Sequence, residues 1–220
     1  MRTVIFDLDG TLADTSHDLI AAANACFQDL GLGQPLDPVA DAATAFRGGR
    51  AMLRLGLSRF GVTDEMAVDA QYPILLTKYR DGIDANTQLY PGAMEAVETL
   101  QSRDYAVGIC TNKPENLAEL LMTRLGVRNM FGALVGADTL SVRKPDPAPY
   151  FAAVARAGGD TARSLLVGDT ETDVDTARAA GVPVVLVTFG PDGEEVSALS
   201  PDALLPDYGQ LPRLVERLIG

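Results

Sequence analysis

The sequence has little of three residue types that often carry catalysis, with one histidine, two cysteines and three lysines in 220 residues. Catalytic triads built on serine or cysteine need a histidine as the base, and His17 lies far in sequence from both Cys26 and Cys110. Cysteine-based nucleophilic catalysis is therefore not expected. Two cysteines make no disulfide framework, and we expect both thiols to be reduced in a cytoplasm.

Basic residues and long apolar runs are also scarce. The 18 Lys and Arg residues are outnumbered by 30 Asp and Glu residues, for a formal net charge of -12. An acidic surface repels nucleic acid and anionic membranes, so we expect neither as a partner, and an anionic substrate needs a locally positive pocket. The apolar run Val182 to Phe189 is far too short to span a membrane, and Asp7 and Asp9 interrupt the N-terminal apolar stretch. We expect a cytoplasmic monomer or homodimer.

Apolar runs of strand length alternate with helical patterns through most of the chain. The strand-like runs are 3–6, 106–110, 133–135, 164–167 and 184–187. The helical patterns between and after them are 91–103, 114–125, 147–157, 171–180 and 211–219. This alternation predicts an α/β fold with a doubly wound parallel sheet. Residues 190–207, rich in Pro, Gly, Asp and Ser, are expected to form a surface loop with little regular structure.

The first strand-like run is separated from the second by nearly a hundred residues. That interval contains helical patterns only, at 16–30, 38–46, 50–60 and 63–80. Helices inserted after a strand end with catalytic character are typical of a cap over an active site. We therefore predict an α/β catalytic core of residues 1–14 and 86–220 and an α-helical cap of residues 15–85.

The most informative segment is Asp7-Leu8-Asp9-Gly10-Thr11, directly after the apolar run Val4-Ile5-Phe6. Side chains alternate along a strand, so Asp7 and Asp9 leave it on the same side. Two carboxylates that close repel each other and stay ionised together only when a cation or many donors lie between them. The segment favours a metal-assisted phosphoryl-transfer site with an aspartate nucleophile. The alternative is an acidic strand end that turns into solvent.

Polar residues follow three other predicted strands, at the edge where open α/β sheets bind ligands. Thr111-Asn112 precedes a helix and suits a phosphate seat, although ordinary helix capping explains the pair as well. Lys144 places a compact ammonium in a chain with fifteen arginines and only three lysines, and a solvated surface lysine is the alternative. Asp169 lies at the end of a strand, and Asp173, on the helix that follows, lies on the same face as Asp169. The alternative role of Asp173 is to stabilise the start of that helix.

These motifs in this order resemble those of the haloacid dehalogenase superfamily of aspartate-dependent phosphatases. The resemblance covers nearly the whole chain, through the segments Asp7 to Thr11, Thr111-Asn112, Lys144-Pro145 and Gly168-Asp169 with Asp173. The helical insertion resembles the family's first-type cap. Within the family, Tyr90-Pro91-Gly92 and Lys144-Pro145-Asp146-Pro147 are similar to segments of phosphoglycolate phosphatases.

The resemblance implies a division of roles between the two acids of the first motif. Asp7 is expected to attack the phosphoryl group and form an aspartyl-phosphate, while Asp9 protonates the leaving oxygen and later takes a proton from water. It also implies Mg²⁺ as cofactor, held by the Asp7 side chain, the Asp9 carbonyl and Asp169; hard oxygen ligands of this kind suit the ion.

The same resemblance assigns roles to the other strand ends. Thr111 and Lys144 are expected to hold the phosphate oxygens, with Asn112 adding to substrate binding. Asp173 is expected to orient Lys144 or a metal-bound water.

In the cap, Arg47-Gly48-Gly49-Arg50 resembles a specificity loop of the phosphoglycolate phosphatase-like subgroup. Its two glycines allow close backbone approach, and Arg47, Gly48 and Arg50 are the predicted binding residues for a second anionic group of the substrate. A plain turn between cap helices, with two surface arginines, is the alternative.

The expected substrate is a small phosphorylated metabolite, with phosphoglycolate favoured. Other members of the superfamily stay open, namely a nucleotidase, a pyrophosphatase or a sugar phosphomutase. A receiver-like domain, which is a phosphorylation switch and not an enzyme, also places acids, Thr and Lys on a parallel sheet. The helical insertion and the second acid, Asp9, count against it.

Overall fold

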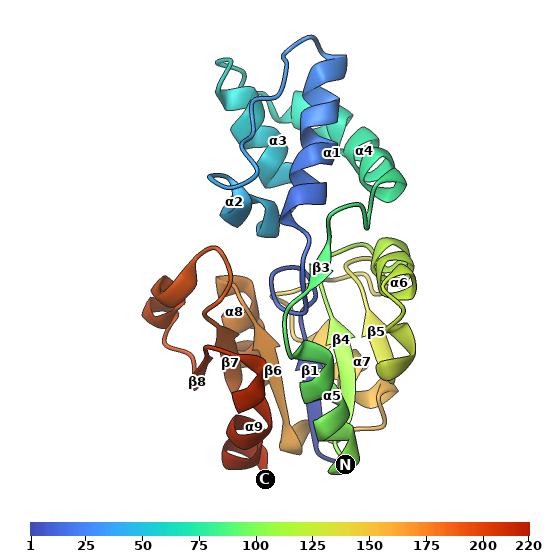
Figure 1. The fold of residues 1–220 in the computed structure, drawn as a ribbon, viewed down its shortest axis with the longest axis vertical. Helices are drawn as coiled ribbons and strands as arrows, with labels where there is room; N and C mark the ends of the chain where they lie inside the picture. Colours follow the sequence, from blue (N-terminus) through green and yellow to red (C-terminus); the bar gives the residue numbers. More distant parts are fainter. The chain divides into compact units, whose positions relative to one another are not determined.

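The computed structural model describes residues 1–220, and Figure 1 shows their elements in chain order. The contacts divide the chain into two compact units. The core unit contains Met1–Ala13 and Leu89–Gly220, and a second unit, which we call the cap unit after the sequence prediction, contains Asp14–Gln88. Two short strands, β2 (Ala13–Asp14) and β3 (Gln88–Leu89), pair with each other where the chain passes between the units.

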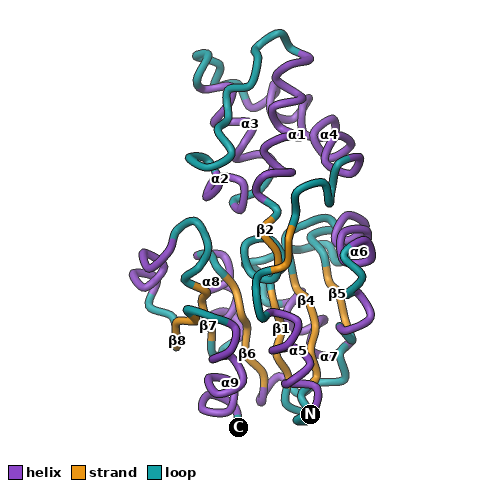
Figure 2. The backbone as a smooth tube through the Cα atoms, viewed as in Figure 1, coloured by secondary structure: helices purple, strands orange, loops and turns teal.

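The core unit is built on one six-stranded sheet in the order β5-β4-β1-β6-β7-β8, with every pair parallel (Figure 2). Its strands are β1 (Thr3–Phe6), β4 (Ala106–Cys110), β5 (Ala133–Val135), β6 (Ser164–Gly168), β7 (Val184–Val187) and β8 (Ala203–Leu205). Every residue of the first five is buried, which explains why they are continuous apolar runs: helices cover both faces of the sheet. The predicted α/β fold with a doubly wound parallel sheet is confirmed.

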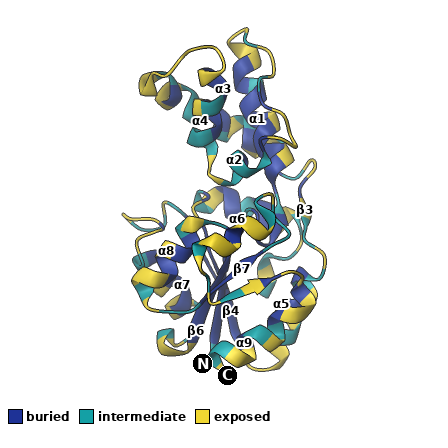
Figure 3. Ribbon diagram, turned by 90° about the vertical axis from the view of Figure 1, so that its left-hand side faces the viewer, coloured by how far each residue is buried: buried dark blue, intermediate teal, exposed yellow.

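Two pairs of helices cover the opposite faces of this sheet. On one face, α5 (Ala93–Ser102) contacts β4, α9 (Leu211–Ile219) contacts β6, and the two helices touch each other. On the other face, α7 (Ala148–Arg156) contacts β1, β4 and β5, and α8 (Glu171–Ala180) contacts β6 and β7. Helix α6 (Glu115–Arg124) packs at the β5 edge. In Figure 3 the central strands of the sheet are dark blue, the colour of buried residues, while the outer sides of the helices are largely yellow.

The strand register decides which residues meet at the carboxyl edge of the sheet. Phe6, the last residue of β1, pairs with Ile109 of β4 and with Val167 of β6. The ladder continues one step further, because the Asp7 amide donates to the Val167 carbonyl at 2.8 Å. The residues that follow β1, β4 and β6 therefore lie side by side.

The prediction of a loop with little regular structure over residues 190–207 is wrong in part. This segment contains the 3₁₀ helix η3 (Gly193–Leu199) and the edge strand β8. Asp202 anchors β8 to β7: its carboxylate accepts a hydrogen bond from the Val184 amide at 2.8 Å, and its own amide donates to the Val184 carbonyl at 3.0 Å. Strand β8 is only partly buried and lies in a segment rich in turn-forming residues, so its sequence gives no clear strand signal.

Apart from the strand residues Asp14 and Gln88 at its two ends, the regular structure of the cap unit is helical. The helices are α1 (Ser16–Asp29), α2 (Ala42–Phe46), α3 (Gly49–Ser58) and α4 (Glu65–Asp81). Helix α1 packs against each of the other three helices. Its buried carboxylate Asp18 accepts hydrogen bonds from the main-chain amides of Asn86 and Thr87, so the start of α1 is tied to the segment that leaves the unit. None of the helices in the chain has both the length and the apolar character of a membrane span.

A close contact between α1 and α3 of the cap unit gives a stability prediction. A Cβ at Gly56 of α3 would lie 2.2 Å from Cζ of Phe27, a fully buried ring on α1. Gly56→Ala is therefore expected to destabilise the protein by about 1–3 kcal/mol, because overpacking outweighs the gain in helix propensity of about 1 kcal/mol. The measurement is the midpoint of urea unfolding. Gly82→Ala is the matched control in the same unit, since a Cβ there meets nothing within 4 Å; an equal midpoint for the two variants would contradict this packing.

Candidate active site

The acids and the lysine predicted to carry the chemistry meet at the carboxyl edge of the sheet. Asp7 follows β1, and its Oδ1 accepts a hydrogen bond from the Leu8 amide at 2.7 Å. Its Oδ2 lies 3.1 Å from Nζ of Lys144, which comes from the loop between β5 and α7. Burial raises the pKa of Asp7 to about 6, although the Lys144 ammonium opposes the rise.

Lys144 is only 2% exposed and is bound by two carboxylates. Its Nζ lies 2.7 Å from Oδ1 of Asp173, in addition to the Asp7 contact. Burial lowers the pKa of Lys144, but the attraction of Asp173 and Asp7 outweighs it and holds the pKa above its ordinary value. The two carboxylates therefore favour the charged ammonium form of Lys144 within the site.

Asp173, fully buried in the first turn of α8, has both carboxylate oxygens engaged. While Oδ1 accepts from Lys144, Oδ2 accepts from the amides of Asp169 and Thr170 and from the Thr170 hydroxyl, at 2.9–3.2 Å. Gly168 makes this possible, since a Cβ there would lie 2.3 Å from the Asp173 carboxyl carbon. Asp173 thus positions Lys144 and caps its helix at the same time.

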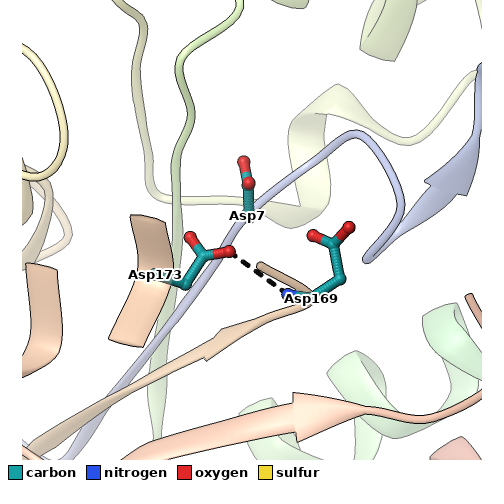
Figure 4. Close-up of side chains that lie close together, drawn as sticks. All are labelled: Asp7, Asp169 and Asp173. Atoms are coloured by element: carbon teal, nitrogen blue, oxygen red, sulfur yellow. Dashed lines mark hydrogen bonds between the residues drawn. The ribbon is translucent and has the colours of Figure 1, made fainter. Parts of the chain in front are cut away.

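Asp169 follows β6, and its Oδ1 accepts a hydrogen bond from the Thr11 hydroxyl at 2.9 Å. Burial raises the pKa of Asp169 well above its usual range, and the negative charge of Asp173 adds to the rise. Figure 4 shows the carboxylates of Asp7, Asp169 and Asp173 gathered in one place. One carboxylate oxygen from each lies within 4.8 Å of the other two.

This acidic cluster fits a hard divalent cation. Three buried carboxylates face one buried ammonium, so the cluster carries more negative than positive charge. Burial, the main cause, and the neighbouring carboxylates together raise the pKa values of Asp7 and Asp169. Because the oxygens of Asp173 already accept four hydrogen bonds, Asp7 and Asp169 are the members with lone pairs to spare. Carboxylate oxygens are the ligands that Mg²⁺ prefers.

The residues after β4 complete this edge. The Thr111 amide donates to the Val135 carbonyl at 2.9 Å, and its hydroxyl accepts from the Lys113 amide at 3.1 Å. The exposed Asn112 donates from its side-chain amide to the Lys144 carbonyl at 3.0 Å, so it supports the Lys144 loop. Lys113, a strand-end lysine to which the sequence assigned no role, places its Nζ 2.8 Å from Oδ1 of Asp9. Its only sequence signal is a scarce lysine directly after Thr111-Asn112.

Comparison with known families identifies this arrangement. Residues 4–187 match the family described as haloacid dehalogenase-like hydrolase. This chain belongs to the haloacid dehalogenase-like hydrolases. The predicted family membership is thereby confirmed, and the hydrolase is an enzyme of the superfamily that the first motif resembles.

Named relatives of this hydrolase align over almost all of its length. A phosphoglycolate phosphatase from Mesorhizobium japonicum is 38% identical over 98% of this chain and 96% of its own. One from Rhodospirillum rubrum is 39% identical over 96% of this chain and 89% of its own. The crystal structure of a predicted phosphoglycolate phosphatase from Haemophilus somnus has the same fold, with a TM-score of 0.85, 24% identity and 97% of each chain covered. These relatives and the family model support a phosphatase.

The remaining predicted site residues of the hydrolase belong to its cap unit. Arg47 follows α2 and is exposed, and Gly48 has a φ of 95°, which favours glycine. Arg50 forms an ion pair with Asp69 and lies over the Tyr72 ring, 4.4 Å from its centroid. Of the two arginines, Arg47 is the one without an ion pair in the chain.

Proposed function

We propose that this hydrolase is a magnesium-dependent phosphomonoesterase that acts on phosphoglycolate. The observation that carries the proposal is the buried Asp7 carboxylate beside the fixed Lys144 ammonium, 3.1 Å away, at the carboxyl edge of the sheet. A carboxylate attacking a phosphate dianion brings like charges together, and a permanent positive charge at the point of attack reduces that cost. The names and identities of the full-length relatives support the substrate.

The reaction proceeds in two displacements at phosphorus. An Asp7 oxygen forms a bond to phosphorus while the bond from phosphorus to the glycolate oxygen breaks, and Asp9, as the carboxylic acid, gives its proton to that oxygen. A water oxygen then attacks the same phosphorus, Asp9 takes a proton from this water, and the bond to Asp7 breaks. Phosphate leaves, and both aspartates return to their starting states.

Mg²⁺ would be held by Asp7, the Asp9 carbonyl and Asp169, and when bound it supplies positive charge that offsets the repulsion between phosphate and carboxylate. Lys144 and Thr111 bind the equatorial phosphate oxygens, with Asn112 beside them. Asp173 keeps Lys144 in place. The cap unit serves as the cap that selects the substrate.

We also propose a cytoplasmic location and, from the net charge of -12, no nucleic acid or membrane partner.

A phosphate-release screen tests the proposed function. Phosphoglycolate, nucleotides, sugar phosphates and pyrophosphate are each supplied with Mg²⁺, and kcat/KM is expected to be highest for phosphoglycolate. Chelation with EDTA is expected to lower the rate by at least about 100-fold, with recovery on adding Mg²⁺, since the acidic cluster is then left uncompensated. A preference for nucleotides or pyrophosphate assigns another phosphatase. Turnover of a hexose phosphate without phosphate release indicates a mutase, and no turnover of any ester supports a receiver-like switch.

The two cap arginines give a specificity prediction. Arg47→Ala is expected to raise KM for phosphoglycolate by roughly 10-fold, because a charge-assisted hydrogen bond to the substrate carboxylate is worth roughly 1.5–3 kcal/mol. Arg50→Ala is expected to raise it less, since Asp69 already engages that guanidinium. Phenyl phosphate, which has no carboxylate, should respond to neither change. Arg54→Ala, which breaks a pair with Glu65 in the same unit, is the control; unchanged KM in all three variants would make residues 47–50 a plain turn.

A further inference from the structure

We propose that Lys113 is a positioning residue, whose ammonium holds the Asp9 carboxylate in the place from which Asp9 exchanges protons with the substrate. The inference rests on the proposed function, in which Asp9 is the acid and base. Nζ of Lys113 lies 2.8 Å from Oδ1 of Asp9, a charge-assisted hydrogen bond of ordinary length.

The main chain of Lys113 is anchored on both sides of the residue. Its amide donates to the Thr111 hydroxyl at 3.1 Å, and its carbonyl accepts from the Ala137 amide, which follows β5, at 3.0 Å. Pro114 comes next and fixes the start of α6. The ammonium is thus carried on a rigid base at the carboxyl edge of the sheet, next to the strand end that bears Asp9.

The burial of this ion pair indicates a specific role. The Lys113 side chain is only 3% exposed and that of Asp9 is 17% exposed. Removing an ammonium from water is unfavourable, and a surface lysine avoids that penalty, so the buried ammonium of Lys113 depends on its carboxylate partner. A lysine also suits this position because its ammonium is a compact charge on an unbranched alkyl chain, whereas the guanidinium group of arginine is planar and wider.

Each of the two acids of the first motif contacts a different buried lysine. Lys144 contacts Asp7, the proposed nucleophile, and Lys113 contacts Asp9, the proposed acid and base. Asp7 and Asp9 thus contact different cations, so the two acids are held separately even though they leave the same strand end. Asp9 has two rotatable side-chain bonds, and losing the bond to Lys113 releases one of its oxygens from a fixed direction.

Leaving-group dependence distinguishes this role from a structural one. The glycolate oxygen of phosphoglycolate needs a proton to leave, whereas 2,4-dinitrophenolate leaves without one. For Lys113→Met, kcat/KM for phosphoglycolate is expected to fall by roughly 100-fold, the scale of lost general acid catalysis, and that for 2,4-dinitrophenyl phosphate by less than about 3-fold. Because kcat/KM reports the first displacement, later steps do not mask the difference. Lys78→Met is the control, as Lys78 pairs with Asp29 in the cap unit, and both values should stay unchanged.

A double-mutant comparison tests whether the effect of Lys113 on activity depends on Asp9. In an Asp9→Asn background, adding Lys113→Met is expected to cause no further loss with phosphoglycolate, because the group that Lys113 holds is already absent. This pair also removes both charges of the buried contact, so it keeps the test open if Lys113→Met alone lowers the melting temperature too far for assay. Lys113→Arg, which keeps the charge, is expected to recover part of the lost activity.

Equal losses for both substrates, or a further loss in the Asp9→Asn background, would overturn the positioning role and assign Lys113 to phosphate binding or to folding. In that case the wild-type protein still hydrolyses both esters and the proposed function stands. If the wild-type protein hydrolyses neither ester, the proposed function fails, and the inference fails with it.

Discussion

Asp7→Asn is expected to lower the turnover of phosphate monoesters by at least about 10⁴-fold, because the amide cannot form the covalent bond to phosphorus. Phosphate release with phosphoglycolate and Mg²⁺ measures the effect. Asp175→Asn is the matched control, an acid-to-amide change at an exposed position of α8, and should leave turnover unchanged. An Asp7→Asn variant that retains turnover would exclude Asp7 as the nucleophile.

The same substitution is expected to stabilise the protein when no metal is present. The pKa of Asp7 is about 6 in the folded chain, against an ordinary value of 3.8 in an unfolded chain. Folding therefore favours the protonated acid, whose contribution to stability is complete below pH 4 and is lost as the pH rises to about 6. That difference corresponds to about 3 kcal/mol above pH 6.

Urea unfolding in EDTA at two pH values checks the sign. At pH 7.5 the midpoint of Asp7→Asn should exceed that of the wild-type protein, and at pH 4 the two should converge. A variant that is less stable than the wild-type protein at pH 7.5 would mean that the contact with Lys144 outweighs the burial of the charge.

Lys144→Met is expected to remove both activity and a large part of the stability. The methionine leaves Asp7 and Asp173 buried together without their shared cation. Breaking a buried pair by removing one partner costs about 3–5 kcal/mol, and loss of the phosphate-binding charge should lower kcat/KM by roughly 100-fold or more. Urea unfolding and phosphate release measure the two effects separately.

Two further variants separate the causes. Lys78→Met breaks an ion pair of the same type whose acid partner, Asp29, is largely exposed, so it should cost less than about 1 kcal/mol. Adding Asp173→Asn to Lys144→Met should recover part of the stability by removing one uncompensated charge, while activity stays lost. If Lys144→Met costs no more than Lys78→Met, Lys144 is not the charge that compensates this cluster.

The sequence predicted the central strands of the sheet well because helices cover these strands on both faces. Strands β1, β4 and β7 were located from apolar runs alone, since a parallel strand covered on both faces is apolar at every position. Strand β8 lies at the sheet edge and alternates in burial, with Leu204 exposed and Leu205 buried, so its three residues carry no such signal. Its place is decided by the bonds of Asp202 to β7.

The candidate site likewise has features that the sequence predicted and features that only the structure shows. Asp7, Thr111 and Asp169 each follow a strand, and strand ends can be read from local sequence, so their meeting at one sheet edge follows from the topology. The engagement of both Asp173 oxygens, by contrast, depends on the lack of a side chain at Gly168 and on the path of the Lys144 loop.

The sequence by itself determined the family, the parallel sheet and the set of acids at its edge, because strand periodicity and short motifs are local properties. Only the tertiary structure decided which charge contacts which. The pairs Lys144–Asp7, Lys144–Asp173 and Lys113–Asp9 join residues from different strand ends, at separations set by sheet register and loop paths. No spacing along the chain encodes a distance of that kind, since it arises only when the sheet is assembled.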